Sequence, residues 1–449
     1  MGHRYYLLLV AYLTSTLGNW MYRLTLPLLV LKLTGSALGA ASLYAIEYGP
    51  FLLLSLLGGV FADRLSRRRL LLVGDGVSAV IAAVLAGVVG AGVTALWPIY
   101  VTAFLLACVE PIYHPAFYSL LPNLVDTDRL AQANSWLQSG ENVINLVGPV
   151  VAGSVIALFD FRIALVVDAV TFALSAVCIA LIRRTTPARV APAAAAAAPA
   201  GSAAAAGSAA TGPADQTAAT TDGGAPGGRG RITVASVVAD IREAGRYIAR
   251  ENRILLAGAL VFAGTNFAIW LVQANFIYYL TQYRHFSPRV VGVVLAAQGA
   301  GAIVGATLAG RLIKRVPPGR VIIACTAGAA AVIGSLTVWR NPIAIAGAWA
   351  VAYALSAMNV VAWFTLRALI VPNHLLGRVV ATTRMLALTT IPLAALLTGG
   401  LENALHNMYL IFALAAVVRL LVAAAALRSP LRGAALARPS VAALAGGDP

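Results

Sequence analysis

Three glutamates and one arginine lie inside long apolar stretches of the chain. Glu47, Glu110, Glu141 and Arg23 are each flanked on both sides by mainly apolar residues. A charge in hydrocarbon is costly, so such residues are candidates for function by default. Carboxyl groups held away from water can take up and release protons near neutral pH. The chemistry that these residues suggest is reversible proton binding.

Arg23 and Glu47 are expected to form one pair. Each lies about 15 Å from the same end of its apolar stretch, at about 1.5 Å per helical residue. Asn19, one helical turn before Arg23, would share its face. One hypothesis is that the pair lines a central cavity and that protonation of Glu47 releases Arg23. The alternative is a static ion pair between adjacent helices.

Glu110 and Glu141 are expected to form a second set at similar depth. Two carboxylates close together make protonation of one of them easier. His114, one turn after Glu110, could share its proton. The alternative is that Glu110 binds backbone groups freed where Pro111 breaks its helix.

The second half of the chain offers fewer candidates, all polar residues within apolar stretches. Arg419 has no obvious acidic partner there, so it is expected to meet an anionic group of a solute, to face a lipid phosphate or to pair with a residue that the sequence does not identify. The other candidates for a solute cavity are Asn266, Gln273 and Asn359.

The sequence GPVVAG predicts close helix packing. Gly148 and Gly153 permit the near approach of a neighbouring helix, and Pro149 is expected to kink its own helix.

The elements that must position these side chains are membrane helices. Of the 449 residues, 60% are hydrophobic and 11% are charged. A soluble domain of this size could not bury so much apolar surface, so the fold class is an all-α membrane protein. Twelve stretches have the length of about 20 residues that a membrane helix needs, near 5–31, 38–61, 69–91, 96–120, 132–158, 162–182, 253–280, 290–313, 320–339, 343–371, 378–399 and 408–427.

The net charge of +16 does not indicate a nucleic-acid partner. Most of the 32 Lys and Arg residues fall on one side of the predicted membrane, in the segments that would be cytoplasmic if both termini are cytoplasmic. The excess of positive charge therefore predicts topology and attraction to anionic lipids.

Five segments follow from the distribution of apolar residues. Two six-helix bundles are expected at 1–186 and 252–428. Between them we expect a disordered cytoplasmic linker at 187–231, rich in Ala and Gly, and an amphipathic helix at 232–251. A disordered tail is expected at 429–449. The three cysteines share no ligand spacing, so neither a metal, a cofactor nor a disulfide is expected.

One charged loop resembles the signature loop of the major facilitator superfamily. In GGVFADRLSRRR, between the second and third apolar stretches, the pattern is filled by Gly59, Asp63, Arg64, Arg67 and Arg68, while Ser66 replaces a usual glycine. The resemblance implies that this loop gates the transport cycle. The alternative is that its arginines only fix topology.

Further segments carry the resemblance through most of the chain. LLGGVFADRL (56–65) aligns with IVGATLAGRL (303–312), as expected for two parallel repeats. The segments TGSALG (34–39) and VPNHLLGRV (371–379) resemble segments of one exporter branch of the superfamily. That branch contains enterobactin-type siderophore exporters and macrolide-efflux proteins.

The resemblance implies twelve helices in two bundles and export of a small amphipathic compound by alternating access, with proton antiport. It implies a monomer in a bacterial inner membrane, with protons and lipids as its other partners, and no enzymatic activity. Two alternatives remain open, namely a lysophospholipid-type flippase of the same fold and a non-transporting receptor or assembly factor.

Overall fold

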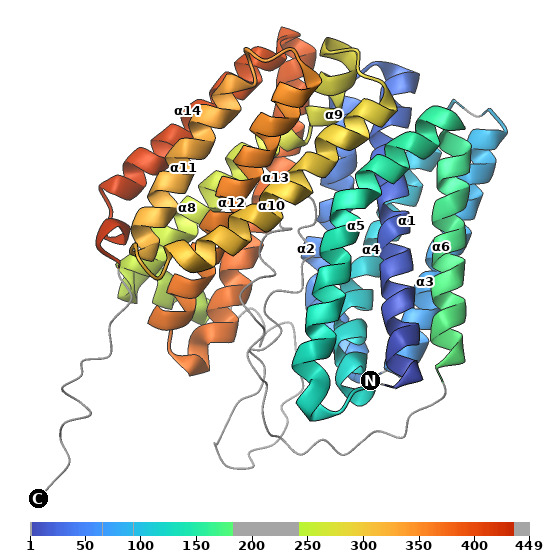
Figure 1. Ribbon diagram of the computed structural model, residues 1–449, viewed down its shortest axis with the longest axis horizontal. Coiled ribbons are helices and arrows are strands. Elements are labelled where there is room, and N and C mark those ends of the chain that lie inside the picture. The colour runs from blue at the N-terminus through green and yellow to red at the C-terminus, as the bar shows by residue number, and fades with distance from the viewer. Residues whose placement is uncertain (1, 65, 93, 183–241, 435–449) are drawn as a thin grey trace, which may run out of the picture.

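The chain folds into helices throughout the part that the computed structural model describes, residues 2–64, 66–92, 94–182 and 242–434 (Figure 1). The first half holds six long helices. They are α1 (His3–Thr34), α2 (Ala37–Arg64), α3 (Arg67–Gly90), α4 (Trp97–Leu120), α5 (Leu130–Leu158) and α6 (Phe161–Leu181).

The second half repeats this arrangement with one broken helix. Its first span is α8 (Arg253–Gln273), continued by α9 (Phe276–Tyr278) and a π-helical turn at Tyr279–Tyr283. The others are α10 (Pro288–Leu312), α11 (Pro318–Ser335), α12 (Pro342–Ile370), α13 (Asn373–Leu405) and α14 (Met408–Leu427). Ten helices of the described chain are long and apolar enough to cross a membrane. Helices α1 and α2, with 32 and 28 residues, are long enough to complete twelve.

Local sequence explains where several helices begin and end. The side chains of Asp160, Asn252 and Asn407 each accept a hydrogen bond from a backbone N–H in the first turn that follows. Short polar side chains satisfy helix N-termini in this way. Gly35 ends α1 with a φ of +64°, a conformation that glycine adopts without strain.

The two bundles meet on one side of the molecule. We call the side with the α1–α2 turn at Gly35 and the α13–α14 turn at His406 the far side, and the opposite side, with the start of α1, the N-terminal side. The bundles contact each other through α5 with α10 and through α2 with α13. Figure 1 shows the bundles close together at the far side and diverging toward the N-terminal side.

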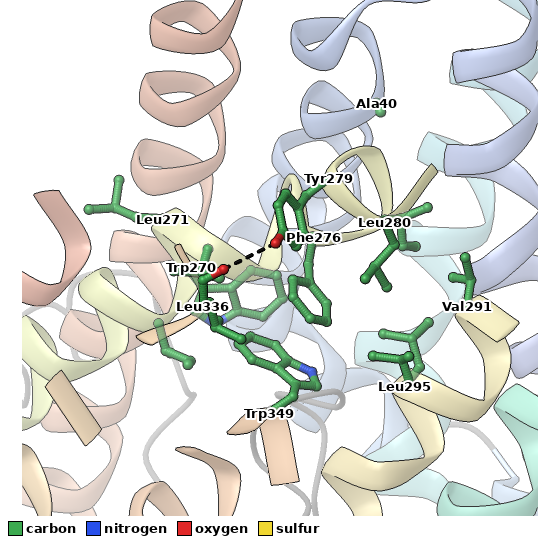
Figure 2. Packing of buried hydrophobic residues seen from close by; sticks show 14 of the residues in the cluster. Ala40, Trp270, Leu271, Phe276, Tyr279, Leu280, Val291, Leu295, Leu336 and Trp349 are labelled. Carbon is green, nitrogen blue, oxygen red and sulfur yellow. Dashed lines mark hydrogen bonds between the residues drawn. The ribbon is translucent and has the colours of Figure 1, made fainter. Parts of the chain in front are cut away.

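Aromatic side chains pack around the break between α8 and α9. Trp349 stacks on Phe276 with ring centroids 4.0 Å apart, and the Tyr279 hydroxyl donates a 3.1 Å hydrogen bond to the Leu336 carbonyl (Figure 2). The same hydrophobic cluster includes Trp20 of the first bundle. This core therefore joins the bundles as well as stabilising the second one.

One predicted segment differs from the expectation at its edge, and two others are described only in part or not at all. The tail does not begin at residue 429, because Pro430–Gly433 forms a 3-10 turn and Leu431 is fully buried. The predicted linker and the first part of the amphipathic helix lie outside the described residues. The rest of that helix buries Ile248 and joins α13 through a 2.6 Å ion pair between Glu243 and Arg378.

Candidate functional site

Two adjoining cavities gather most of the residues predicted for proton coupling and solute binding. The first lies within the N-terminal bundle, and its charged or titratable lining residues are Tyr12, Tyr22, Arg23, Glu47, Asp75, Glu110, Tyr113, His114 and Glu141. The second lies between the bundles and shares Trp20, Tyr22, Arg23 and Glu47 with the first. A solute in these cavities would therefore meet charged groups from the first bundle.

Glu110 is held between two basic side chains. Its Oε1 atom lies 3.8 Å from Nη2 of Arg23 and 3.5 Å from Nε2 of His114, one turn along α4. At such separations the attraction between unit charges is about 4 kcal/mol in a medium of intermediate polarity. Side-chain exposures of 20% for Arg23 and 27% for Glu110 leave both groups accessible from the cavity. Helix α4 runs through Pro111 without a break, so the predicted break is wrong.

Glu47 belongs to the same group of charges. It projects from α2, lines both cavities and lies close enough to Arg23 and Glu110 to interact with them electrostatically. The predicted partners Arg23 and Glu47 are thus neighbours, and Glu110 joins them. The two sets of charges expected from the sequence form a single cluster.

Glu141 and Asn145, on α5, are held by hydrogen bonds from α1. Tyr12 donates its hydroxyl proton to Oε2 of Glu141 over 3.2 Å. Trp20 donates its indole N–H to Oδ1 of Asn145 over 3.2 Å. Asn19, the predicted neighbour of Arg23, also lines the first cavity. Tyr12 and Trp20 both come from α1, which therefore positions groups across the cavity on α5.

Two buried aspartates were missing from the predicted site. Asp75 on α3 is 1% exposed and accepts hydrogen bonds from Ser175, at 2.6 Å, and from Tyr113, at 3.3 Å. Asp168 on α6 is fully buried, and neither of its carboxyl oxygens has a hydrogen-bond partner in the described chain. The sequence does carry a signal for both, since each is an acidic residue in the middle of an apolar stretch.

The candidates of the second half are dispersed. Gln273 lines the cavity between the bundles and accepts a 2.7 Å hydrogen bond from Tyr353. Asn266 donates to the Ala387 carbonyl, and Asn359 donates to Thr326, so both serve contacts inside their own bundle. Arg419 is 1% exposed and donates to Ser356, but Nε and Nη1 have no partner among the described residues. Neither cavity is lined by Asn266, Asn359 or Arg419.

The GPVVAG segment lies at the seam between the bundles. A Cβ atom at Gly153 would lie 3.2 Å from the Cα of Gly292 on α10, and the Pro149 carbonyl approaches the same glycine. Gly148 packs against the Trp20 ring. Because only glycine leaves room for such contacts, this segment brings α5 and α10 into backbone contact on the far side.

The predicted gating loop is described only in part. Gly59, Asp63 and Arg64 lie in the last turns of α2, where the side chains are outside the described part of the structure. Arg68 donates hydrogen bonds to the carbonyls of Ile179, at 3.1 Å, and Ala180, at 2.5 Å. A cation at a helix C-terminus satisfies free carbonyls there. Arg68 therefore connects the start of α3 to the end of α6. Arg67 is not a free charge either, since it too has an interaction partner.

Comparison with known families agrees with this architecture. Residues 8–273, more than half of the chain, match the family described as Major Facilitator Superfamily. The chain belongs to the major facilitator superfamily. Its helices are thus those of a multi-pass membrane transporter family.

Curated relatives of the chain include proteins named for efflux. The chain is 24% identical over 305 residues to the uncharacterized MFS-type transporter YfiS of Bacillus subtilis, covering 68% of this chain and 63% of YfiS. It is 32% identical over 182 residues to the multidrug efflux pump Tap of Mycolicibacterium fortuitum, covering 39% of this chain and 44% of Tap. Macrolide efflux protein A of Streptococcus pyogenes is 19% identical over 180 residues, 40% of this chain and 44% of that protein. The chain thus spans less than two thirds of each relative.

Solved structures of the superfamily share the fold over 95% of the chain. A bacterial homologue of the human lysosomal transporter Spinster, inward-facing and occupied, superposes with a TM-score of 0.68 at 14% identity and is covered to 97%. A bacterial homologue of the iron transporter ferroportin is covered to 99% and 14% identical. Its inward-facing structure gives a TM-score of 0.64, and its outward-facing structure with soaked iron gives 0.55.

Proposed function

We propose that this transporter exports a small amphipathic organic compound, such as a drug or another metabolite, by alternating access and in exchange for protons. The observation that carries the proposal is the junction of the two cavities at Arg23 and Glu47. The wall from the first bundle is charged, while the second bundle adds Trp270, whose ring lies 5.4 Å from that of Tyr44. A compound with a charged end and a flat apolar body would contact both walls.

The charges of the first cavity favour a cationic compound. Glu47, Glu110 and Glu141 outnumber Arg23 and His114, so the cavity is acidic even if His114 is charged. In this proposal, carboxyl groups of the first cavity exchange protons as the solute enters and leaves, and Glu47, Glu110 and Glu141 are the candidates that the sequence predicts. The names of Tap and macrolide efflux protein A, which describe efflux, support export.

The orientation and the state of the molecule complete the proposal. The excess of Lys and Arg favours a cytoplasmic location for both termini in a bacterial inner membrane. The far side would then be external, and the described conformation, which is closed there, would face the cytoplasm. The better superposition on inward-facing structures supports this assignment. Gating by Asp63, Arg64 and the neighbouring arginines stays a prediction, as does the monomeric state.

The test is proton-coupled efflux in everted membrane vesicles. Ethidium and Hoechst 33342 would serve as probes, and loss of an imposed pH gradient would report proton movement. We expect dye-dependent proton movement in the wild type and its loss in at least one of Glu47→Gln, Asp75→Asn, Glu110→Gln and Glu141→Gln. Asp160→Asn is the matched control, because Asp160 is an exposed helix cap to which asparagine is equally suited.

Two results would contradict the proposal. Dye efflux and proton movement that continue unchanged when all four of these carboxyl groups are replaced together would exclude them from coupling. Absence of dye transport, combined with translocation of a fluorescent lysophospholipid in proteoliposomes, would favour a lipid flippase instead.

A further inference from the structure

We propose that Asp75, backed by Asp168, holds the coupling proton of this transporter, apart from the cluster of Arg23 and Glu110 that meets the solute. This inference rests on the proposed proton antiport and deepens it. It assigns proton binding to a position on α3 and α6 rather than to the glutamates. The two positions form one hydroxyl-rich strip beside the first cavity.

The first argument is a difference in partners between the carboxyl groups of the cavity. Glu110 has two basic neighbours, Arg23 and His114, which stabilise its anion. Asp75 has two hydroxyl neighbours, Ser175 and Tyr113, and no ion pair joins it within the described part of the chain. A buried carboxylate without a cation costs several kcal/mol, which protonation avoids. The proton therefore belongs on Asp75 while Glu110 stays ionised.

The second argument is the environment of Asp168. It is fully buried, and both of its carboxyl oxygens lack partners among the residues described. Thr171 and Ser175 follow it at three and seven residues, so these side chains lie along one face of α6. Ser175 then reaches Asp75 over 2.6 Å. An anion at Asp168 would be uncompensated, so this carboxyl is neutral too.

Access to water separates the roles of the two aspartates. Asp75 lines the first cavity, whereas Asp168 is not among the lining residues. Water that enters the cavity can accept the proton from Asp75, which becomes a carboxylate bound by Ser175 and Tyr113. Asp168 keeps its proton. No second negative charge then lies on α6 that would oppose the deprotonation of Asp75. Asp75 is thus the exchanging group, and Asp168 is a positioning residue.

The other titratable groups near the strip are few. Helix α4 places Tyr113 on Asp75, with Glu110 and His114 beside it in the sequence, and α1 places Tyr22 near Asp168. The remaining charged groups of the same cavity come from α1, α2 and α5, and they are Arg23, Glu47 and Glu141. Arg23 pairs with Glu110, Glu47 lies near both of them, and Glu141 accepts a hydrogen bond from Tyr12.

The first test needs no solute. Infrared spectra of the purified full-length transporter, recorded in acidic and in alkaline buffer and compared between the wild type and each variant, would report the C=O stretch of protonated carboxyl groups. We expect Asp75→Asn to remove the part of this band that alkali abolishes, and Asp168→Asn to remove a part that alkali does not change. Asp160→Asn, at the exposed N-cap of the helix that carries Asp168, should leave the band unchanged. An unaltered band in both buried variants would overturn the proposal, as would a band that sodium ions remove at constant pH.

The second test measures ethidium affinity as a function of pH. If one proton must leave before the dye binds, affinity rises by about tenfold per pH unit where the group titrates. Asparagine imitates the protonated state, so Asp75→Asn should bind ethidium weakly at every pH, and Asp75→Glu should restore the slope. Glu110→Gln should weaken binding but keep the slope. A normal slope in Asp75→Asn would overturn the assignment.

These tests separate the two proposals. If the wild type neither binds nor exports ethidium, the proposed function fails for this class of solute, while the infrared result still decides whether Asp75 binds a proton.

Discussion

The side-chain oxygen of Asn403 accepts a hydrogen bond from the backbone N–H of Leu38, 3.3 Å away, and so joins the end of α13 to the start of α2. The Asn403 amide also donates to the Ser36 hydroxyl over 3.2 Å. These bonds connect the two bundles at the far side. They must break whenever the far side opens, so they bias the molecule toward the conformation described here.

We expect Asn403→Leu to reduce the population that is closed on the far side. Loss of about 1 kcal/mol of hydrogen bonding corresponds to about a fivefold shift in a two-state equilibrium. Spin labels at the exposed Lys32 and Leu405, with Cys108 replaced by serine, would measure the distance across this side. Asn341→Leu is the control, because Asn341 makes a similar far-side hydrogen bond within one bundle. An unchanged distance distribution in Asn403→Leu would show that these bonds do not hold the bundles together.

Two glycines of α10 should respond oppositely to alanine. A Cβ atom at Gly292 would lie 3.0 Å from the carbonyl carbon of Pro149. Gly292→Ala should therefore force α5 and α10 apart. At Gly310 nothing lies within 4 Å, and alanine should stabilise the helix by about 0.5–1 kcal/mol. Thermal unfolding and the same spin-label distance would report both effects. A gain in stability from Gly292→Ala would contradict the close contact.

Arg23 and Glu110 should show energetic coupling in a double-mutant cycle. Each single change, Arg23→Gln or Glu110→Gln, leaves the other charge with less compensation, whereas the double change removes both. We expect the double variant to lose less stability than the two single variants combined, by about 1–2 kcal/mol. Chemical unfolding of the detergent-solubilised protein is the measurement. Arg162→Gln, paired with Glu110→Gln, supplies a non-contacting arginine for comparison.

Arg419 should be dispensable for stability. A buried cation with one hydroxyl partner and two unbonded nitrogens costs free energy that an apolar side chain of similar length does not. Arg419→Met should therefore raise the free energy of unfolding by about 1–4 kcal/mol, while Arg432→Met, at an exposed position, should have little effect. Loss of ethidium export in Arg419→Met would instead support the role in solute binding that the sequence suggested.

The helices could be predicted from the sequence, because each membrane span leaves a long apolar stretch. The break between Gln273 and Phe276 could not, since Asn275 at that point looks like any polar residue in an apolar span. The turn that buries Leu431 was also missed. The segment is short and contains few large apolar residues. Its ordered conformation depends on contact with α11, which no local sequence pattern reveals.

The candidate site could be predicted in its residues but not in its arrangement. Glu47, Glu110 and Glu141 stand out because charges are rare in apolar spans. Their meeting in one cavity depends on the rotation of α2, α4 and α5 about their axes, which depth along a helix does not determine. Gly153 predicted a close approach, but its partner Gly292 follows from the packing of two bundles. Asp75 gave the same signal as the glutamates and was overlooked.

The far-side seam has a consequence for the medium in which the transporter works. The contacts described there are glycine backbones in van der Waals contact and hydrogen bonds from an amide side chain, and neither depends on net charge. Dissolved ions screen interactions between exposed charges over distances of about 10 Å and have little effect on such contacts. Closure of this side should therefore be nearly independent of ionic strength, so the transporter could keep the same resting conformation in dilute and in saline surroundings.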